Sequence, residues 1–163
     1  MKIVLLVVVV IIFGYIGYGL SAYYINRTKF FNSLEFLFDK LTHEINFSQG
    51  KLIEIIKDYN SQNKDVERLS KNFINCLEYD LEVKNETIFD GIKILNEEEK
   101  NVVVLFLKSL GKFDAYNQTK QLTNQKQQIN LFYKNAEEEQ KKYSPLYLKI
   151  GVIAGLVVAL IFA

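Results

Sequence analysis

Side chains that could carry out chemistry are few in this chain of 163 residues. Its one histidine, His43, has no second histidine or cysteine nearby in sequence with which to bind a metal or activate a nucleophile. Its one cysteine, Cys76, excludes an internal disulfide bond and lacks the basic neighbourhood that makes a thiol reactive. We therefore interpret His43 as a surface or packing residue and Cys76 as a small buried side chain.

Two runs of glutamate, residues 97–99 and 137–139, gather carboxylates as general acid–base sites do. The first run follows Asn96 and is typical of a helix start, where an amide oxygen caps backbone N–H groups and acids favour the positive end of the helix dipole. The second run precedes Lys141 and Lys142 by four residues and is typical of a solvated helix face with ion pairs. The chain also has no glycine-rich phosphate loop, dinucleotide fingerprint or metal-ligand spacing. We predict that it is not an enzyme and binds no cofactor, metal or small-molecule substrate.

Two apolar segments flank the rest of the chain. Residues 3–25 contain no charged side chain, and residues 146–163 contain one, Lys149. A helix needs roughly 20 apolar residues, at a rise of about 1.5 Å each, to cross a bilayer, and a lysine near its end can extend to the headgroups. Four tyrosines toward the end of the first segment suit a membrane–water interface: Tyr15, Tyr18, Tyr23 and Tyr24. The sequence predicts an N-terminal transmembrane helix at residues 1–26 and a C-terminal one at residues 146–163.

A cleaved signal peptide is the alternative interpretation of the first segment. Lys2 precedes the apolar run, and Gly19, Leu20 and Ser21 form a small-x-small cleavage pattern. The apolar run continues past this pattern to Ile25, which favours an uncleaved anchor.

Charge is confined almost entirely to residues 27–145. All 19 acidic residues and 18 of the 20 basic ones lie there, so this middle domain has a net charge of about −1 with both signs mixed. Such a surface is typical of a solvated domain and excludes a nucleic-acid-binding footprint. Basic residues on the domain side of both segments favour a cytoplasmic domain with both termini outside the cell membrane.

Apolar residues recur at helical spacing through the middle domain, and its only proline is Pro145. The first helix should continue from the span and end near Gly50, and the next three should lie near residues 52–59, 64–80 and 88–95. The fifth should begin after Asn96 and end at Gly111, and the sixth should begin after Asp114. Five residues of the sixth helix form a seven-residue repeat: Ala115, Leu122, Ile129, Ala136 and Tyr143. At Pro145 we expect a new helix or a kink.

These patterns predict an all-α fold, with an antiparallel bundle of about six helices in residues 27–145 flanked by the two transmembrane helices. Small residues inside the spans suggest close packing of helices. Gly151 and Gly155 form a small-xxx-small motif, and Gly14 and Gly17 offer a weaker notch. We expect these glycines to pack the two spans together or against another membrane subunit.

Leucines recur at 34, 37 and 41, and seven further residues stand at positions that together form a recognisable pattern: Glu44, Ile45, Leu52, Leu110, Gly111, Asp114 and Gln118. With this combination the chain resembles the stage III sporulation protein AB family over nearly its whole length. Lys149, Ile150 and Gly151 also resemble the start of the family's last span. Ser48 and Lys51 depart from the family's glycine-x-x-proline turn, and Phe113 precedes Asp114 without the expected basic residue after it.

The resemblance implies a mother-cell membrane protein of a secretion-like channel complex required for endospore formation. Its helical domain would be similar to the six-helix cytoplasmic domain of type II secretion F platform proteins. It would act as a scaffold among other stage III sporulation subunits and would dock the ATPase of the complex. We expect the contact surfaces at residues 117–142 and 46–52.

The sequence leaves two other functions open. A subunit of a membrane enzyme or transporter would need polar groups inside the spans, and neither span has a charge at its centre. A general secretion or pilus platform usually has two copies of the helical domain and three spans, whereas this sequence shows one copy and two spans.

Overall fold

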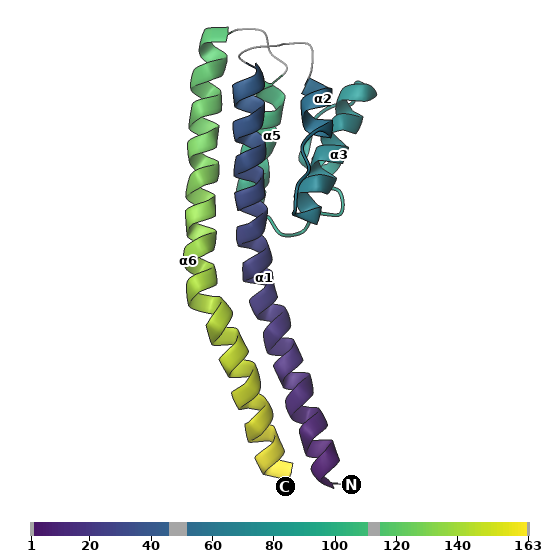
Figure 1. The fold of residues 1–163 in the computed structure, drawn as a ribbon, viewed down its shortest axis with the longest axis vertical. Helices are drawn as coiled ribbons and strands as arrows, with labels where there is room; N and C mark the ends of the chain where they lie inside the picture. Colours follow the sequence, from purple (N-terminus) through teal and green to yellow (C-terminus); the bar gives the residue numbers. More distant parts are fainter. Residues whose placement is uncertain (1, 46–51, 111–114, 163) are drawn as a thin grey trace. The chain divides into compact units, whose positions relative to one another are not determined.

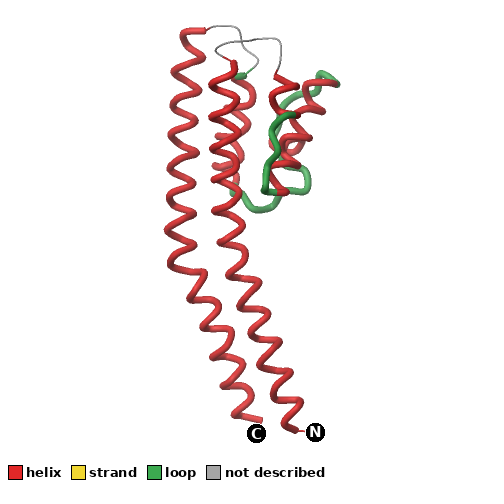
Figure 2. The backbone as a smooth tube through the Cα atoms, in the orientation of Figure 1, coloured by secondary structure: helices red, strands yellow, loops and turns green. Residues whose placement is uncertain are grey.

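The computed structural model describes residues 2–45, 52–110 and 115–162, with side chains except at residues 2, 3, 5, 44, 45 and 115–121. Throughout these ranges the chain forms helices and connecting loops, with no strand (Figure 2). The helices are α1 (Lys2–Ile45), α2 (Leu52–Lys57), α3 (Lys64–Glu78), α4 (Asn85–Ile88), α5 (Glu97–Ser109) and α6 (Ala115–Phe162) (Figure 1). The predicted all-α fold is confirmed.

Each predicted span forms one continuous helix with its neighbouring segment. The first span runs directly into the first helix of the middle domain, as expected, and together they make α1. At the other end, the sixth helix and the second span make α6, and Pro145 lies inside it. No new helix begins at Pro145, because a proline removes only one helical N–H donor and the flanking turns keep their own hydrogen bonds.

The predicted helix at residues 88–95 is wrong. The single turn of α4 ends at Ile88, and Gly91 then adopts a φ of +72°, a left-handed conformation that stops a helix. The side-chain amide of Asn72 donates to the carbonyl of Ile88 at 2.9 Å and satisfies the end of the turn. The four apolar residues that suggested a helix are all buried, although only the first belongs to α4: Ile88, Phe89, Ile92 and Leu95.

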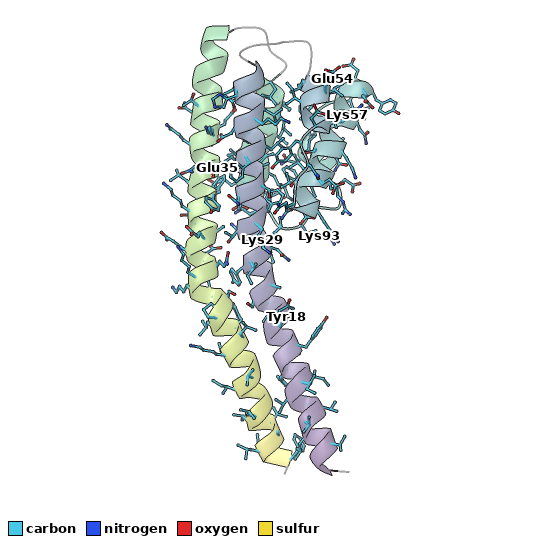
Figure 3. All side chains as sticks on the ribbon, in the orientation of Figure 1. Tyr18, Lys29, Glu35, Glu54, Lys57 and Lys93 are labelled. Atoms are coloured by element: carbon cyan, nitrogen blue, oxygen red, sulfur yellow. The ribbon has the colours of Figure 1, made fainter. Side chains whose placement is uncertain are left out.

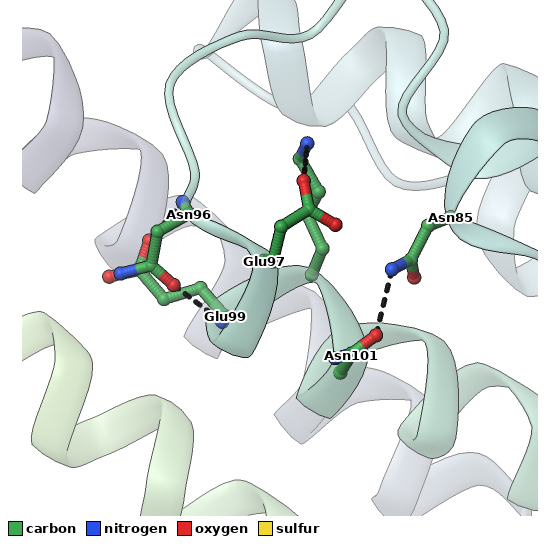
Figure 4. Close-up of polar contacts among 6 residues, drawn as sticks. Asn85, Asn96, Glu97, Glu99 and Asn101 are labelled. Carbon is green, nitrogen blue, oxygen red and sulfur yellow. Dashed lines mark hydrogen bonds and ion pairs between the residues drawn. The ribbon is translucent and has the colours of Figure 1, made fainter.

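The expected start of the fifth helix is confirmed by its hydrogen bonds. The Asn96 side chain accepts from the backbone N–H of Glu99 at 2.9 Å, and the Glu99 carboxylate accepts from the backbone N–H of Asn96 at 2.9 Å (Figure 4). This reciprocal capping box satisfies two donors that a helix N-terminus otherwise leaves unpaired. Asn63, directly before the predicted helix at residues 64–80, caps α3 because its side-chain oxygen accepts from the backbone N–H groups of Asp65 and Val66.

The chain divides into two compact units. The central unit comprises residues 29–134, and the terminal unit comprises residues 1–28 together with 135–163. In the central unit, α1 contributes six buried apolar side chains to the core: Phe30, Phe31, Leu34, Leu37, Phe38 and Leu41. Phe38 stacks on Phe106 of α5 with ring centroids 3.5 Å apart, and the apolar stripe of α6 buries Leu122 and Ile129. Each such side chain contributes about 1.5–3 kcal/mol by leaving water.

Candidate helix-packing site

In the terminal unit, α1 and α6 come so close that a glycine is needed on each. A Cβ added to Gly17 would lie 2.7 Å from the carbonyl oxygen of Tyr147 and 3.0 Å from Cα of Gly151. A Cβ added to Gly151 would lie 2.8 Å from the carbonyl oxygen of Phe13 and 2.9 Å from Cα of Gly17. Glycines that face each other in this way let two helix backbones touch, which maximises van der Waals contact between helices in lipid.

The other two predicted packing glycines differ from each other. A Cβ on Gly155 would lie 3.0 Å from Cα of Val10 and 3.1 Å from Cβ of Phe13, so Gly155 extends the close contact by one turn. A Cβ on Gly14 would meet nothing within 4 Å. Within this structure the notch of α1 is therefore formed by Gly17, while Gly14 faces open space.

Two hydroxyl contacts continue the helix pair beyond the glycines, and the sequence analysis did not identify them. The hydroxyls of Ser21 and Ser144 share a buried hydrogen bond of 2.6 Å. The Thr28 hydroxyl donates to the carbonyl of Ala136 at 2.9 Å. Buried hydroxyls between apolar helices stabilise their pairing because each satisfies a group that would otherwise lose its partners. A serine inside the first apolar segment and another just before the second were the available signal.

Aromatic rings and an ion pair lie at the same end of the terminal unit. The ring of Tyr24 stacks on Tyr147 with centroids 5.6 Å apart and an angle of 13°, and it lies 5.4 Å from the ring of Tyr143. The Arg27 guanidinium lies 3.7 Å from the carboxylate of Glu139. These contacts pair residues more than 110 positions apart, which no spacing in the sequence reveals.

The family-motif positions do not come together as one described site. Leu52 is half-buried on α2, and Leu110 is buried at the end of α5. Gly111 and Asp114 lie outside the described residues, as do the side chains of Glu44, Ile45 and Gln118. Of the expected contact surfaces, residues 46–51 also lie outside the description, while from residue 122 onward α6 presents polar side chains around buried Leu122, Ile129 and Ala136.

The side chains that could carry out chemistry are buried, exposed to solvent or part of a helix cap. Cys76 is only 1% exposed, and burial raises the pKa of its thiol above the usual range, which disfavours the nucleophilic thiolate. His43, Glu97 and Glu98 are exposed, and Glu99 belongs to the capping box. In the part of the chain that the structure describes, no group of three or more His, Cys, Asp or Glu side chains could hold a metal ion.

Two helices are long and apolar enough to cross a membrane, Leu6–His43 and Leu122–Phe162, among the residues that the structure describes. A core helix of a water-soluble protein and, near the N-terminus, a signal sequence pass the same test, but a core helix is mostly buried. Here only 11% of each apolar window is buried, and large aliphatic side chains such as Ile11, Ile153 and Leu160 are exposed. Exposed apolar surface of this extent is typical of contact with lipid or with a partner.

Comparison with known proteins identifies the family. The family model of stage III sporulation protein AB matches residues 2–163. The chain belongs to this family. The stage III sporulation protein AB match includes both terminal helices and the central unit, so the paired glycines belong to the region that the family covers. No curated protein and no solved structure matches the chain.

Proposed function

We propose that the chain is a non-enzymatic, membrane-anchored scaffold subunit of the mother-cell, secretion-like channel complex required for endospore formation. The observation that carries this proposal is the stage III sporulation protein AB match over residues 2–163. A match to the terminal helices as well as to the central unit favours this role over a general secretion platform or a transporter subunit. Other stage III subunits are then its partners.

In this proposal α1 and α6 anchor the chain in the cell membrane as a helical hairpin. The exposed aliphatic side chains of both helices support a lipid environment, and the glycine contacts support pairing without an added subunit. Basic residues at the domain side of both spans, including Arg27 and Lys142, favour a central unit in the mother-cell cytoplasm and both termini outside.

The central unit would dock the ATPase of the complex through the exposed face of α6. A hollow of about 520 Å³ lies on this face and is lined by Glu35, Thr123, Lys126, Gln127, Asn130 and Leu131. Leu131 is 57% exposed among these polar side chains and would serve as an apolar anchor for a partner. Polar contacts hold side chains of the hollow in place. Asn130 donates to the Glu35 carboxylate at 2.6 Å, and Lys126 lies 2.7 Å from Asp39.

A matched pair of variants tests this docking surface. Leu131→Asp places a charge at the anchor, and Leu105→Asp makes the same change at a leucine of α5 that is 55% exposed. Each full-length variant would be purified in mild detergent from sporulating cells, and the co-purified ATPase would be measured against wild type. We expect Leu131→Asp to lose about tenfold or more of the ATPase, corresponding to a hot-spot loss of roughly 1.4 kcal/mol or more, while Leu105→Asp retains it. Equal retention by both variants would contradict this surface, and no ATPase with wild type would contradict docking itself.

A further inference from the structure

The pairing of α1 with α6 shows which residues of the two helices lie at the same depth in a membrane. The helices of the terminal unit run antiparallel, since Val10 packs beside Gly155 while Thr28 bonds to Ala136. At any given depth, two adjacent and aligned helices are surrounded by the same medium, which is water, headgroups or hydrocarbon. The polarity of one helix therefore limits where its neighbour can lie in hydrocarbon.

Charged residues of α6 lie beside the last part of the apolar segment of α1. Tyr24 contacts Tyr143, and the next contacts toward the central unit include the ion pair between Arg27 and Glu139. Lys142 lies over the Tyr143 ring, 5.1 Å from its centroid. Charged side chains are rare in hydrocarbon because they lose their hydration there. Residues 22–25 of α1 are therefore at a level where hydrocarbon would also have to surround these charges.

An exposed tyrosine and an exposed lysine lie at one level of the helix pair, although exposed aliphatic side chains continue past it to Leu20 and Leu146. Toward the chain termini, both helices expose aliphatic side chains, including Val7, Ile11, Ile153 and Leu156. Closer in sequence to residues 29–134, α1 exposes Tyr18 (Figure 3), and α6 exposes Lys149. Lys149 is two residues from Gly151 and from Tyr147, both of which contact Gly17, so Lys149 and Tyr18 lie close to one level.

We propose that the phospholipid headgroup layer surrounds the terminal unit at the level of Tyr18, Ser21, Ser144 and Lys149. The Lys149 ammonium binds lipid phosphates there, and residues 21–25 lie in or above this layer although they belong to the uncharged segment 3–25. Side chains of a helix tilt toward its N-terminus, which in α6 is the side of this layer, so Lys149 can reach the phosphates. The first span then ends about five residues, or roughly 7 Å, before Ile25. The inference rests on the membrane location proposed above.

Depth measurements on the full-length protein test the position of the layer. Ile12→Cys and Tyr23→Cys would each be made in a Cys76→Ser background, labelled with a fluorophore and reconstituted in phosphatidylcholine–phosphatidylglycerol vesicles. We expect iodide in the water phase to quench the Tyr23→Cys label at least about fivefold more than the Ile12→Cys label, since about 16 Å of helix separates the two positions. Lipids brominated in mid-chain should quench the Ile12→Cys label preferentially. Protection of the Tyr23→Cys label from iodide, with mid-chain quenching equal to that at Ile12, would overturn the proposal.

Variants of Lys149 test the phosphate contact. Lys149→Leu removes the charge that limits how deeply the paired helices α1 and α6 enter the bilayer. The Tyr23→Cys label should then move toward the hydrocarbon by about one helical turn, or roughly 5 Å. Lys149→Arg keeps the charge and should leave the depth unchanged. An unchanged depth in Lys149→Leu would overturn the role of Lys149.

Extraction of wild-type membranes with alkaline carbonate separates this proposal from the one on which it rests. Release of the protein by carbonate would contradict the membrane anchor and therefore the proposed function. Retention of the protein together with a deep Tyr23→Cys label would contradict only the position of the headgroup layer.

Discussion

At the residue scale, Gly17 and Gly151 determine how closely α1 and α6 can approach. Each would place a Cβ within 3.0 Å of backbone atoms of the other helix, and backbone cannot rotate out of the way as a long side chain can. Gly14 lies on the same helix as Gly17 and has open space where its Cβ would be. The same substitution at Gly14 and at Gly17 therefore distinguishes an effect on helix packing from an effect on helix propensity.

We predict that Gly17→Ile separates the two helices and that Gly14→Ile does not. The readout is a disulfide between Ser21→Cys and Ser144→Cys, whose native hydroxyl oxygens are 2.6 Å apart. Overpacking of about 1–3 kcal/mol should lower the cross-linking yield at least about fivefold in Gly17→Ile. Gly14→Ile should cross-link as efficiently as the parent. Similar yields in both variants would show that the close approach of Gly17 is unimportant.

The thiol of Cys76 gives a prediction that depends on pH. Burial raises its pKa, so at neutral pH the thiolate fraction falls below that of an exposed cysteine, and burial also blocks reagents. We expect maleimide to label Cys76 in the folded protein at least about tenfold more slowly than an added cysteine at exposed Lys93→Cys. Cys76 labelling should rise as the pH increases through its elevated pKa. Rapid labelling of Cys76 at pH 7 would contradict its burial, and a denatured sample provides the control.

At the element scale, capping determines where α5 begins. Asn96 and Glu99 exchange hydrogen bonds through the capping box. Asn101 lies on the same helix, and its side chain bonds to the exposed side chain of Asn85 (Figure 4). Loss of an N-cap costs roughly 0.5–2 kcal/mol, because the Asn96 side-chain oxygen no longer accepts from the backbone N–H of Glu99.

We predict that Asn96→Ala destabilises the folded chain by about 1–2 kcal/mol and that Asn101→Ala changes its stability by less than about 0.5 kcal/mol. Thermal unfolding of the full-length protein in mild detergent, followed by circular dichroism, measures the difference. Equal unfolding temperatures for the two variants would mean that the capping box contributes little.

The helices were predictable from the sequence wherever local physics determines them. Apolar spacing located α3 and α5, and Asn96 marked the start of α5. The sequence failed at residues 88–95, because the Asn72 amide and the left-handed Gly91 terminate the turn through contacts that a periodic pattern does not contain. It also missed Ser21–Ser144 and Tyr24–Tyr147, because the register between α1 and α6 depends on which glycines meet. Gly17, Gly151 and Gly155 were foreseen as small residues, but not which faced which.

At the scale of the whole molecule, the chain combines a central helical unit with a terminal unit built from both ends of the sequence. Two helices that could each cross a membrane frame a domain of mixed charge, and the stage III sporulation protein AB match covers all of it. This organisation suits a scaffold, which needs an anchor and a surface for partners and does not need a catalytic centre.

A count of heat-resistant spores tests directly whether the chain is required for endospore formation. It would be made on a strain that lacks only this gene and on the same strain carrying either the wild-type gene or the Gly17→Ile variant. We predict that deletion blocks development after engulfment and lowers the spore count by orders of magnitude, while vegetative growth stays normal. The wild-type gene should restore the count, and Gly17→Ile should restore it poorly. A normal spore count in the deletion strain would contradict a required role in the sporulation complex.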